Sequence, residues 1–340
     1  MQRRMGVGEL LDDAGRLVER GWATAEVRRY RWEQARPAQP ERLKEWDYYC
    51  ILTPDVGLAL TVADNGCMGF LGVSWMDFGA RTFVNGGVGM PEAKGAMSMP
   101  PSADVGDIVQ DHPRLRMAFR HEAGGRRLSV DAPGFDKGRG LSGELWLAQP
   151  PMDRMVIATP FADVPEAFYY NQKINCLPAS GRITYASRDY DFTPDSAFGV
   201  LDWGRGVWTI DNTWYWGSAS GLVQGKPFGF NIGYGFGDTS AASENMLFHD
   251  GKAHKLAEIA FHLPPGAPDS GPWRFTSSDG RFEMDFAPIV DRAAAFAMED
   301  ISSSQHQVFG RFSGVAVLDD GTRVEVRDLI GFAEEVRNHW

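Results

Sequence analysis

Short hydrophobic runs separated by turn residues dominate the chain from about residue 44 onward. Runs rich in Val, Ile, Tyr, Trp and Phe are interrupted by Gly, Asp, Asn or Pro about every 8 to 12 positions, a spacing typical of an antiparallel sandwich or barrel. In the first half of the chain we expect strands over residues 46–52, 57–63, 70–78, 81–85, 115–121, 126–131 and 144–148.

Four glycine-containing turns lie between such runs and indicate β-hairpins. Asp-Gly between alternating apolar runs supports primed turns, whose twist suits antiparallel strands. The turns are at residues 124–125 (GG) and at 250–251, 279–280 and 320–321 (all DG). Only residues 290–298 have the pattern of a helix longer than about two turns. We therefore predict an antiparallel, mainly β fold.

The chain divides into three parts by its pattern. Residues 1–42 are the least β-like and form an N-terminal arm. Within them, residues 25–36 (AEVRRYRWEQAR) predict either one helical turn or an extended segment, ending at the PAQP sequence of residues 37–40. We expect a first β domain over residues 43–205 and a second over residues 206–340.

A long connection interrupts the first β domain. Residues 86–105 (GGVGMPEAKGAMSMPPSADV) are rich in Gly and Met and too irregular for a strand. Loops of this length are uncommon unless they have a function, such as covering a pocket. A lid and a solvent-exposed insertion are both consistent with this sequence.

Composition and charge narrow the classes of partner. Lys and Arg number 34 and Asp and Glu 45, so the net charge of −11 would repel a phosphate backbone, and we expect no nucleic-acid partner. Cys50, Cys67 and Cys176 form no CxxC pair, which favours reduced thiols of a cytoplasmic protein over a disulfide framework. The N-terminal sequence MQRRMGVGELLDDAG is not that of a signal peptide. No segment has the roughly 18 apolar residues of a membrane span.

The segment 169–217 combines polar groups with many aromatic residues and is the strongest candidate for a pocket. Within it, Asp202 directly precedes Trp203 in the sequence LDWGRG, and a core strand gains nothing from such glycines. A carboxyl in an apolar pocket can act as a general acid near neutral pH, because desolvation favours its protonated form. Alternatively, Asp202 caps a turn or pairs with Arg205 or Arg188.

A second cluster lies between residues 228 and 254. Glycine alternates with aromatic residues or Asn in FGFNIGYGFGD, so one strand face is nearly bare and a ligand or another backbone can approach it. Asp238, Glu244 and Asn245 follow on a Ser/Thr-rich loop. Glu244 or Asp238 could join Asp202 as a second carboxylate for acid–base chemistry. The alternative is that Asp238 forms an Asx turn and Glu244 lies on the surface.

Three polar residues alternate along one predicted strand. Asn171, Lys173 and Asn175 in YYNQKINC share a face, which suits a polar ligand or a carboxylate partner, although a solvated outer face has the same pattern. Aromatic walls with a few converging polar groups are the usual composition of a ligand site. The other residues expected to line or anchor a pocket are Trp203, Arg205, Trp216, Asn231, Tyr234, Phe236 and Asn245.

The sequence contains no established catalytic or cofactor motif. GxSxG, P-loop and HExxH motifs are missing, and GYGFGD at residues 233–238 lacks the glycine spacing of a dinucleotide loop. His249 and His254 flank a turn and could face each other, which is a weak metal signal. Asp47 is expected to be a structural charge paired with Arg or Lys. We predict neither a cofactor nor a metal.

Longer stretches of sequence resemble a known family. The segments KEWDYYCI, GVSWMDF, NQKINCLPASG and GFNIGYGFGDTSAASENMLFHDGKAHKL resemble a bacterial domain-of-unknown-function family, number 2804. The resemblance covers most of the chain, from about residue 10 to residue 340. It implies a common fold and little about activity.

A more distant resemblance extends the expected architecture. The layout YYN…ASGRI…AFGVLDWGRGVW…WYWG is similar to that of AttH-like proteins and of the hydroxyneurosporene synthase (carotenoid 1,2-hydratase) group. This resemblance implies two lipocalin-like domains with a ligand pocket at or between them, and it places Asp202 at an acidic motif position. The chain departs from the group in having Trp203 and Gly204 directly after Asp202, without the usual His.

These observations favour an all-β protein of two lipocalin-like barrels or sandwiches. The favoured function is an enzyme that uses carboxylate acid–base chemistry on an apolar or amphipathic small molecule, by hydration, isomerisation, cyclisation or glycoside cleavage. Asp202 would be the acid, and Glu244 or Asp238 the second carboxylate. The alternatives are a non-catalytic binder of lipids or other hydrophobic ligands and a structural β scaffold. The sequence leaves the oligomeric state open.

Overall fold

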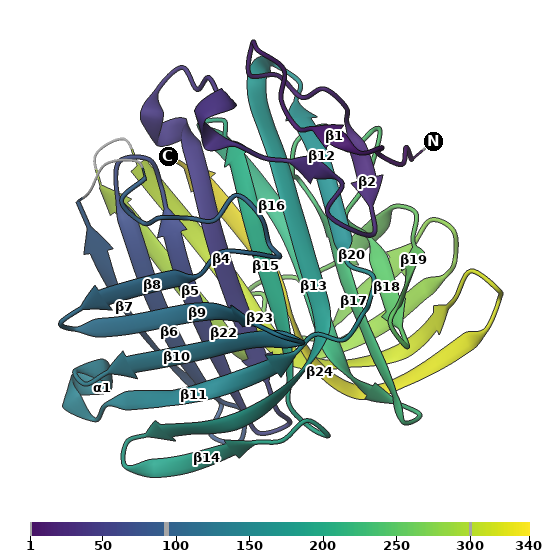
Figure 1. Cartoon of the computed structure of the whole chain (residues 1–340). Coiled ribbons are helices and arrows are strands. Elements are labelled where there is room, and N and C mark those ends of the chain that lie inside the picture. Colours follow the sequence, from purple (N-terminus) through teal and green to yellow (C-terminus); the bar gives the residue numbers. More distant parts are fainter. Residues whose placement is uncertain (1, 92–94, 299–300) are drawn as a thin grey trace.

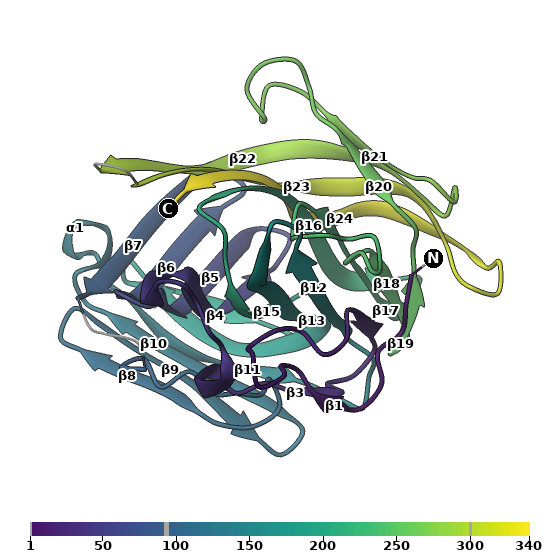
Figure 2. The same ribbon diagram turned by 90° about the horizontal axis from the view of Figure 1, so that it is seen from above.

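Two curled antiparallel β-sheets face each other in the computed structural model, which describes residues 2–91, 95–298 and 301–340 (Figures 1 and 2). The expectation of an all-β fold with two lipocalin-like halves is confirmed. The sheet changes between Val207, the last residue of one strand, and Asp211, the first residue of the next. No helix among the described residues is long and apolar enough to cross a membrane.

The first sheet has 13 strands and is formed by residues before Asp211. Its strands are β2 (Gly21–Ala23), β4 (Leu43–Leu52), β5 (Val56–Asp64), β6 (Gly69–Asp77), β7 (Thr82–Met90), β8 (Ile108–His112), β9 (Leu115–Glu122), β10 (Gly125–Ala132), β11 (Leu141–Ala148), β12 (Met155–Phe161), β13 (Val164–Tyr185), β14 (Arg188–Phe192) and β15 (Phe198–Val207). Its main order is β7-β6-β5-β4-β15-β13-β11-β10-β9-β8, with β12 and β14 also paired to β13, and β2 to β12.

The second sheet has nine strands in the order β19-β18-β17-β16-β24-β23-β22-β21-β20. They are β16 (Asp211–Val223), β17 (Lys226–Tyr234), β18 (Met246–His249), β19 (Lys252–Lys255), β20 (Ile259–His262), β21 (Trp273–Ser277), β22 (Phe282–Met298), β23 (Ile301–Val317) and β24 (Arg323–His339). The smaller elements of the chain are β1 (Gly8–Glu9), β3 (Arg28–Arg29), α1 (Phe135–Gly138) and the 3-10 turns Trp32–Gln34 and Pro40–Arg42.

A β-bulge in the long strand β13 bends the first sheet. The register with β15 shifts between Ile174 and Leu177, and Cys176 has a φ of 59°. Before the bulge β13 pairs with β12 and β15, and after it with β15, β11 and β14. Bulges increase local twist and redirect a strand, so this one lets a single strand belong to both parts of the curled sheet.

Two apolar cores stabilise the fold. One fills the curl of the second sheet and includes Phe230, Phe282 and Phe312, whose rings pack edge to face. The other extends through the first sheet and includes Phe309 and Phe332 from the second. Strand β15 is buried along its whole length, because it is central in its sheet and covered on both faces.

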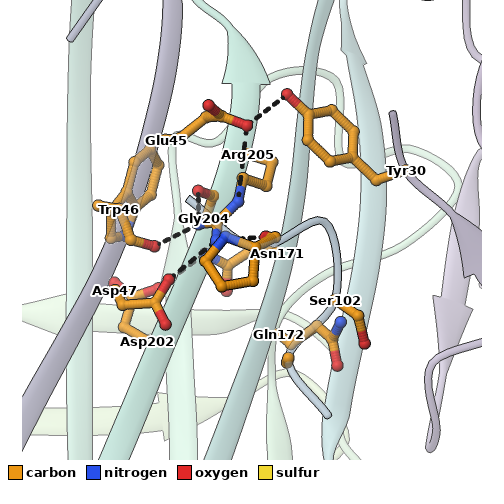
Figure 3. A network of polar contacts seen from close by, with 12 residues as sticks. Tyr30, Glu45, Trp46, Asp47, Ser102, Asn171, Gln172, Asp202, Gly204 and Arg205 are labelled. Carbon is orange, nitrogen blue, oxygen red and sulfur yellow. Dashed lines mark hydrogen bonds and ion pairs between the residues drawn. The ribbon is translucent and has the colours of Figure 1, made fainter. Parts of the chain in front are cut away.

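The N-terminal segment and the residues near Pro100 contact the outer face of β4 and β15 through Tyr30 and the Pro100 carbonyl oxygen. Figure 3 shows Tyr30, Glu45 and Arg205 in this polar network. The fully buried guanidinium of Arg205 donates to Asp47 Oδ1 at 2.9 Å and to the carbonyl oxygen of Pro100 at 2.9 Å. Its Nε lies 3.7 Å from Glu45, which also accepts a hydrogen bond from the Tyr30 hydroxyl. The expected pairing of Asp47 with a basic residue is confirmed.

Several local predictions can be compared with these elements. The four predicted turns lie between strands as expected; Asp250 and Gly251, for example, have φ values of 51° and 79°. Residues 290–298 are not helical but belong to β22, where pairing with β23 overrides the helix propensity of an Ala-rich segment. Segment 25–36 is extended apart from one 3-10 turn.

The prediction that residues 86–105 contain no strand is wrong at their start. Residues 86–90 continue β7, because their backbone pairs with β6 despite the glycines. Residues 92–94 lie outside the described residues. Farther along, Met97 packs against Gly69, and the carbonyl oxygens of Pro100 and Ala103 accept hydrogen bonds from Arg205 and Arg126. This described part of the segment therefore packs on the outer face of the first sheet.

Replacing Arg205 with Met should lower the free energy of unfolding by about 3–5 kcal/mol, the usual cost of breaking a buried ion pair. The variant would leave the buried Asp47 carboxylate without its guanidinium. Denaturant unfolding would measure the loss. Arg182→Met is the control, because Arg182 pairs with Asp189 and Asp191 on the exposed surface, where ion pairs contribute little. Equal stability of the two variants would contradict this account.

Candidate active site

A cavity of about 380 Å³ lies between the two sheets. The first sheet contributes residues of β4, β5, β6, β7, β13 and β15, and the second contributes residues of β16, β22, β23 and β24. Nine of the lining residues are aromatic, and five charged side chains line the cavity: Lys44, Lys173, Asp202, Arg292 and Glu334. This combination of apolar walls and a few polar groups is that of a small-molecule site.

A buried ion pair lies on the first-sheet side of this cavity. Lys173 on β13 is directly opposite Asp202 on β15, and Lys173 Nζ lies 2.7 Å from Asp202 Oδ1. Asn171 Nδ2 donates to the same oxygen at 2.7 Å. Lys173 Nζ also lies 4.0 Å from the centroid of the Trp216 ring, a cation–π contact. With two donors on Oδ1, Asp202 is an ion-pair acceptor and not the isolated acid that the sequence suggested.

Gly204 makes room for the aromatic wall next to this pair. It lies opposite Trp46 of β4, and a Cβ on Gly204 would collide with the Trp46 indole. The bare backbone lets the indole lie across the strand, where it stacks on Tyr169 at 6.3 Å and contacts Trp208 at 5.8 Å. Phe236 stacks on the other side of Tyr169 at 4.9 Å. The glycine of the LDWGRG sequence is therefore explained by a close approach.

Glu334 is a buried carboxyl of this cavity whose pKa lies near neutral pH. It is 4% exposed and accepts hydrogen bonds from Trp214 Nε1 at 2.8 Å and Gln307 Nε2 at 2.9 Å. Burial raises the pKa of Glu334 to about 7, although the Trp214 hydrogen bond and the charges of Arg292 and Lys173 oppose this. A carboxyl with a pKa near 7 can both donate and accept a proton under physiological conditions.

Gln307 joins Glu334 to the first sheet. Its Oε1 accepts hydrogen bonds from the Tyr48 hydroxyl at 3.1 Å and from Arg292 Nη2 at 2.6 Å. Arg292 Nη1 in turn donates to Ser74 Oγ on β6 at 3.1 Å. This chain fixes the orientation of the Gln307 amide, because its oxygen is held by Tyr48 and Arg292. The amide nitrogen is thereby directed to Glu334.

Glu244 lies behind the aromatic wall and does not line the cavity. It is fully buried, and its Oε1 accepts a hydrogen bond from the Tyr169 hydroxyl at 2.7 Å. Asn231 connects it to the wall, since Asn231 Oδ1 accepts from Trp216 Nε1 at 2.6 Å and Nδ2 lies 3.3 Å from Glu244 Oε2. Burial raises the pKa of Glu244, with the charge of Lys173 the largest opposing effect. Glu244 and Asn231 thus orient two wall residues.

The structure places several predicted site residues away from the cavity. Trp203 and Arg205 project to the opposite face of β15 from Asp202, so the prediction that they line the pocket is wrong. Trp203 packs edge to face on Tyr170. Tyr234 was also expected to line the pocket, but it packs with other aromatic residues in the curl of the second sheet.

Three more predicted residues are engaged elsewhere. Asp238 forms the Asx-type contact to the Ser240 backbone and an ion pair with Arg20, so it is not a second carboxylate of this cavity. Asn175 donates to Ser218 Oγ at 2.8 Å, which ties β13 to β16. Asn245 accepts from the Gly233 backbone at 2.8 Å and donates to a carbonyl, a structural role in the 233–245 loop.

Metal binding has no support in the described part of the chain. No group of three or more His, Cys, Asp or Glu residues there is arranged to hold an ion. His249 and His254 do not face each other, since they lie opposite Lys252 and Leu247 in the hairpin.

Sequence reasoning missed Glu334, Arg292 and Gln307, which come from the last three strands of the chain. One signal was present. Ile330, Phe332, Glu334 and Val336 alternate along β24 and are all buried, so the acid stands out on an otherwise apolar face. Such a carboxyl is costly to bury without a function or a partner.

Comparisons with known proteins agree with this architecture. A family model described as a domain of unknown function, DUF2804, matches residues 2–340. A search of curated proteins finds no match.

Three solved structures share the fold at low sequence identity. A protein from Nitrosomonas europaea with a provisional AttH assignment has 15% identity and a TM-score of 0.57, over 92% of this chain and 98% of that one. CghA, solved with Sch210972, has 13% identity and a TM-score of 0.53, over 98% and 97%. Kievitone hydratase from Nectria haematococca has 9% identity and a TM-score of 0.50, over 89% and 91%. At these identities the likeness establishes the fold alone.

The raised pKa of Glu334 predicts a pH-dependent contribution to stability. The pKa of Glu334 is about 7 in the folded protein, above its ordinary 4.5, so protonation of Glu334 stabilises the fold at low pH. This contribution to stability is lost as the pH rises from 4.5 through 7. At about 1.4 kcal/mol per pKa unit, the difference in unfolding free energy between wild type and Glu334→Gln should fall by about 3 kcal/mol over this range. Denaturant unfolding at several pH values measures it.

Glu335→Gln is the matched control, because Glu335 is the next residue and lies on the opposite face of β24. Burial raises the pKa of Glu335, but the hydrogen bonds from Tyr215 and Arg337 outweigh this effect, so the pKa lies below its ordinary value. This variant should therefore show no such decline between pH 4.5 and 7 relative to wild type. A pH-independent difference for Glu334→Gln would contradict the assignment.

Proposed function

The chain belongs to the DUF2804 family, and we propose that it is an enzyme that transfers protons to and from a largely apolar small molecule bound between its two sheets. The observation that carries this proposal is the presence, in one aromatic-walled cavity, of a carboxyl that titrates near neutrality and a separate buried ion pair. Acid and base groups in different electrostatic environments are the usual requirement for general acid–base catalysis.

Glu334 is the proposed proton donor. In its protonated form it can transfer a proton to a hydroxyl leaving group or to an unsaturated carbon of the ligand. The hydrogen bonds from Trp214 and Gln307 fix its orientation. A donor with a pKa near the working pH combines a sufficient protonated population with a sufficient driving force for transfer.

Asp202 and Lys173 are the proposed partners of this acid. Both donors to Asp202 bind Oδ1, so Oδ2 is the oxygen available to take a proton from the ligand. Lys173 can stabilise negative charge that develops next to it. In a dehydration, Glu334 would protonate the departing hydroxyl to water while Asp202 removes a proton from the adjacent carbon. Hydration is the reverse, and a double-bond shift uses the same two transfers.

The solved structures of similar fold support this reaction class by analogy only. One of them is named a hydratase, and another was solved together with a small molecule. These are properties of those proteins. For this chain the argument depends on Glu334, Asp202 and Lys173.

A non-catalytic binder of hydrophobic ligands is the competing function, and the aromatic wall alone would suit it. A binder gains nothing from a carboxyl held partly protonated behind two fixed hydrogen bonds, because burying such a group costs free energy. The two functions differ in whether solvent protons reach the bound molecule.

Deuterium exchange distinguishes them. A panel of hydroxylated and unsaturated apolar compounds is screened for binding by quenching of the tryptophans that line the cavity. Compounds that bind are then incubated in deuterated water and analysed by mass spectrometry. Glu334→Gln should lower the exchange or turnover rate by at least about a hundredfold, the usual contribution of a general acid, with ligand affinity retained.

The pH profile provides a second readout. The wild-type rate should fall as the pH rises above about 7, because Glu334 then loses its proton. This inflection should be missing in Glu334→Gln and present in the control Glu335→Gln. Ligands that bind but never exchange, or a Glu334→Gln variant as active as wild type, would favour the binder.

A further inference from the structure

The charge inside the cavity is opposite in sign to that of the whole chain. The chain has a net charge of −11, whereas the cavity is lined by three cations (Lys44, Lys173 and Arg292) and two acids (Asp202 and Glu334). Lys173 is paired with Asp202, and Glu334 is partly neutral at physiological pH. The excess positive charge therefore lies with Lys44 and Arg292.

These two cations differ in the number of hydrogen-bond acceptors that they contact. Arg292 donates to Gln307 Oε1 through Nε and Nη2, and to Ser74 Oγ through Nη1. Its guanidinium is thus held by neutral acceptors on both sheets. Lys44, at the start of β4, has only a long contact of 3.4 Å from Nζ to the Asn65 carbonyl oxygen.

Lys44 is buried and makes no ion pair with a described residue. It is 6% exposed, and the charges of Glu41 and Asp64 act on it only from beyond ion-pair distance. The ring of Trp340 lies 4.8 Å from the ammonium and supplies a cation–π contact in place of a charge. Burial lowers the pKa of Lys44 to about 8, so the side chain remains mostly charged at neutral pH. An uncompensated buried charge of this kind is costly.

Other donors gather at the same end of the cavity. Gly206 lies directly opposite Lys44 in the sheet, and Trp208 Nε1 is 3.3 Å from the position that a Cβ on Gly206 would occupy. Trp208 Nε1 and Trp340 Nε1 are both buried, and neither has a hydrogen-bond acceptor in the described part of the chain. The two indole N–H groups therefore lack an acceptor among the described residues, and the Lys44 ammonium has only the long contact to the Asn65 carbonyl oxygen.

We propose that this end of the cavity binds a carboxylate, so that the ligand is an amphipathic carboxylic acid whose head group pairs with Lys44. The inference deepens the proposed function, because it takes the same cavity as the substrate site. The acid group lies at Lys44 and the apolar body extends along Trp46 and Trp208 toward Glu334. Arg42, whose charge also acts on Lys44, does not line the cavity, so the single ammonium at this end of the wall suits a monoanion better than a phosphate dianion, which usually recruits bidentate Arg.

The test compares decanoic acid with methyl decanoate and decanol, which share an apolar chain and differ in the head group. Binding is measured at neutral pH by quenching of the cavity tryptophans. Decanoic acid should bind about tenfold or more tightly than the ester, as expected for a charge-assisted hydrogen bond. Lys44→Met should abolish this preference, and Lys44→Arg should retain it. Retained affinity for decanol shows that a variant is folded.

Lys252→Met is the control, since Lys252 is exposed on β19 and does not line the cavity. It should keep the preference for the acid. Equal affinity of the wild type for acid and ester, or a preference that persists in Lys44→Met, would overturn the inference.

The result is separable from the proposed function. If decanoic acid binds no more tightly than its ester, the carboxylate site is overturned, but the deuterium-exchange test of Glu334→Gln still decides whether the protein is an enzyme. Conversely, decanoic acid could bind more tightly than its ester in a Lys44-dependent way while no bound ligand exchanges deuterium. That result would support the carboxylate site and overturn the proposal that the protein is an enzyme.

Discussion

The buried pair of Lys173 and Asp202 is the constraint around which the inner face of the molecule is arranged. Strand register places the two side chains opposite each other, and neither can be left uncompensated between two packed sheets. Asn171 completes the pair from one side and the Trp216 ring covers Lys173 from the other. The aromatic wall therefore surrounds a fixed charge pair, and the space beside it remains a cavity lined by both sheets.

The same strands have a different function on each face. Along β15, Asp202 and Gly204 face the cavity, whereas Trp203 and Arg205 face outward and anchor the N-terminal segment and the region near Pro100. The outer ion pairs hold β4 and β15 in register, so they indirectly fix the position of Trp46 opposite Gly204. The stabilising ion pairs and the proposed ligand site thus lie on opposite faces of a single strand, as its two-residue alternation requires.

The sequence predicted the all-β architecture correctly, but it did not predict which face of a strand individual side chains occupy. Alternation gives two sets of residues per strand, and nothing local says which set faces the second sheet, so Trp203 was assigned to the wrong face. Glu334 was missed because its partners Trp214 and Gln307 are brought to it by sheet pairing over long sequence separations. The Ala-rich residues 290–298 were misread for a related reason, since pairing with β23 decides their conformation.

On the proposed mechanism, Glu334 exchanges a proton near neutral pH inside the cavity. Infrared difference spectroscopy tests it directly, by following the carbonyl band of protonated carboxyl groups during a pH titration of wild type against Glu334→Gln. A band present only in wild type should disappear with a midpoint at a pH of about 7. A titration in which wild type and variant lose the same bands, or in which Glu334 is already ionised at pH values near its ordinary 4.5, would contradict it.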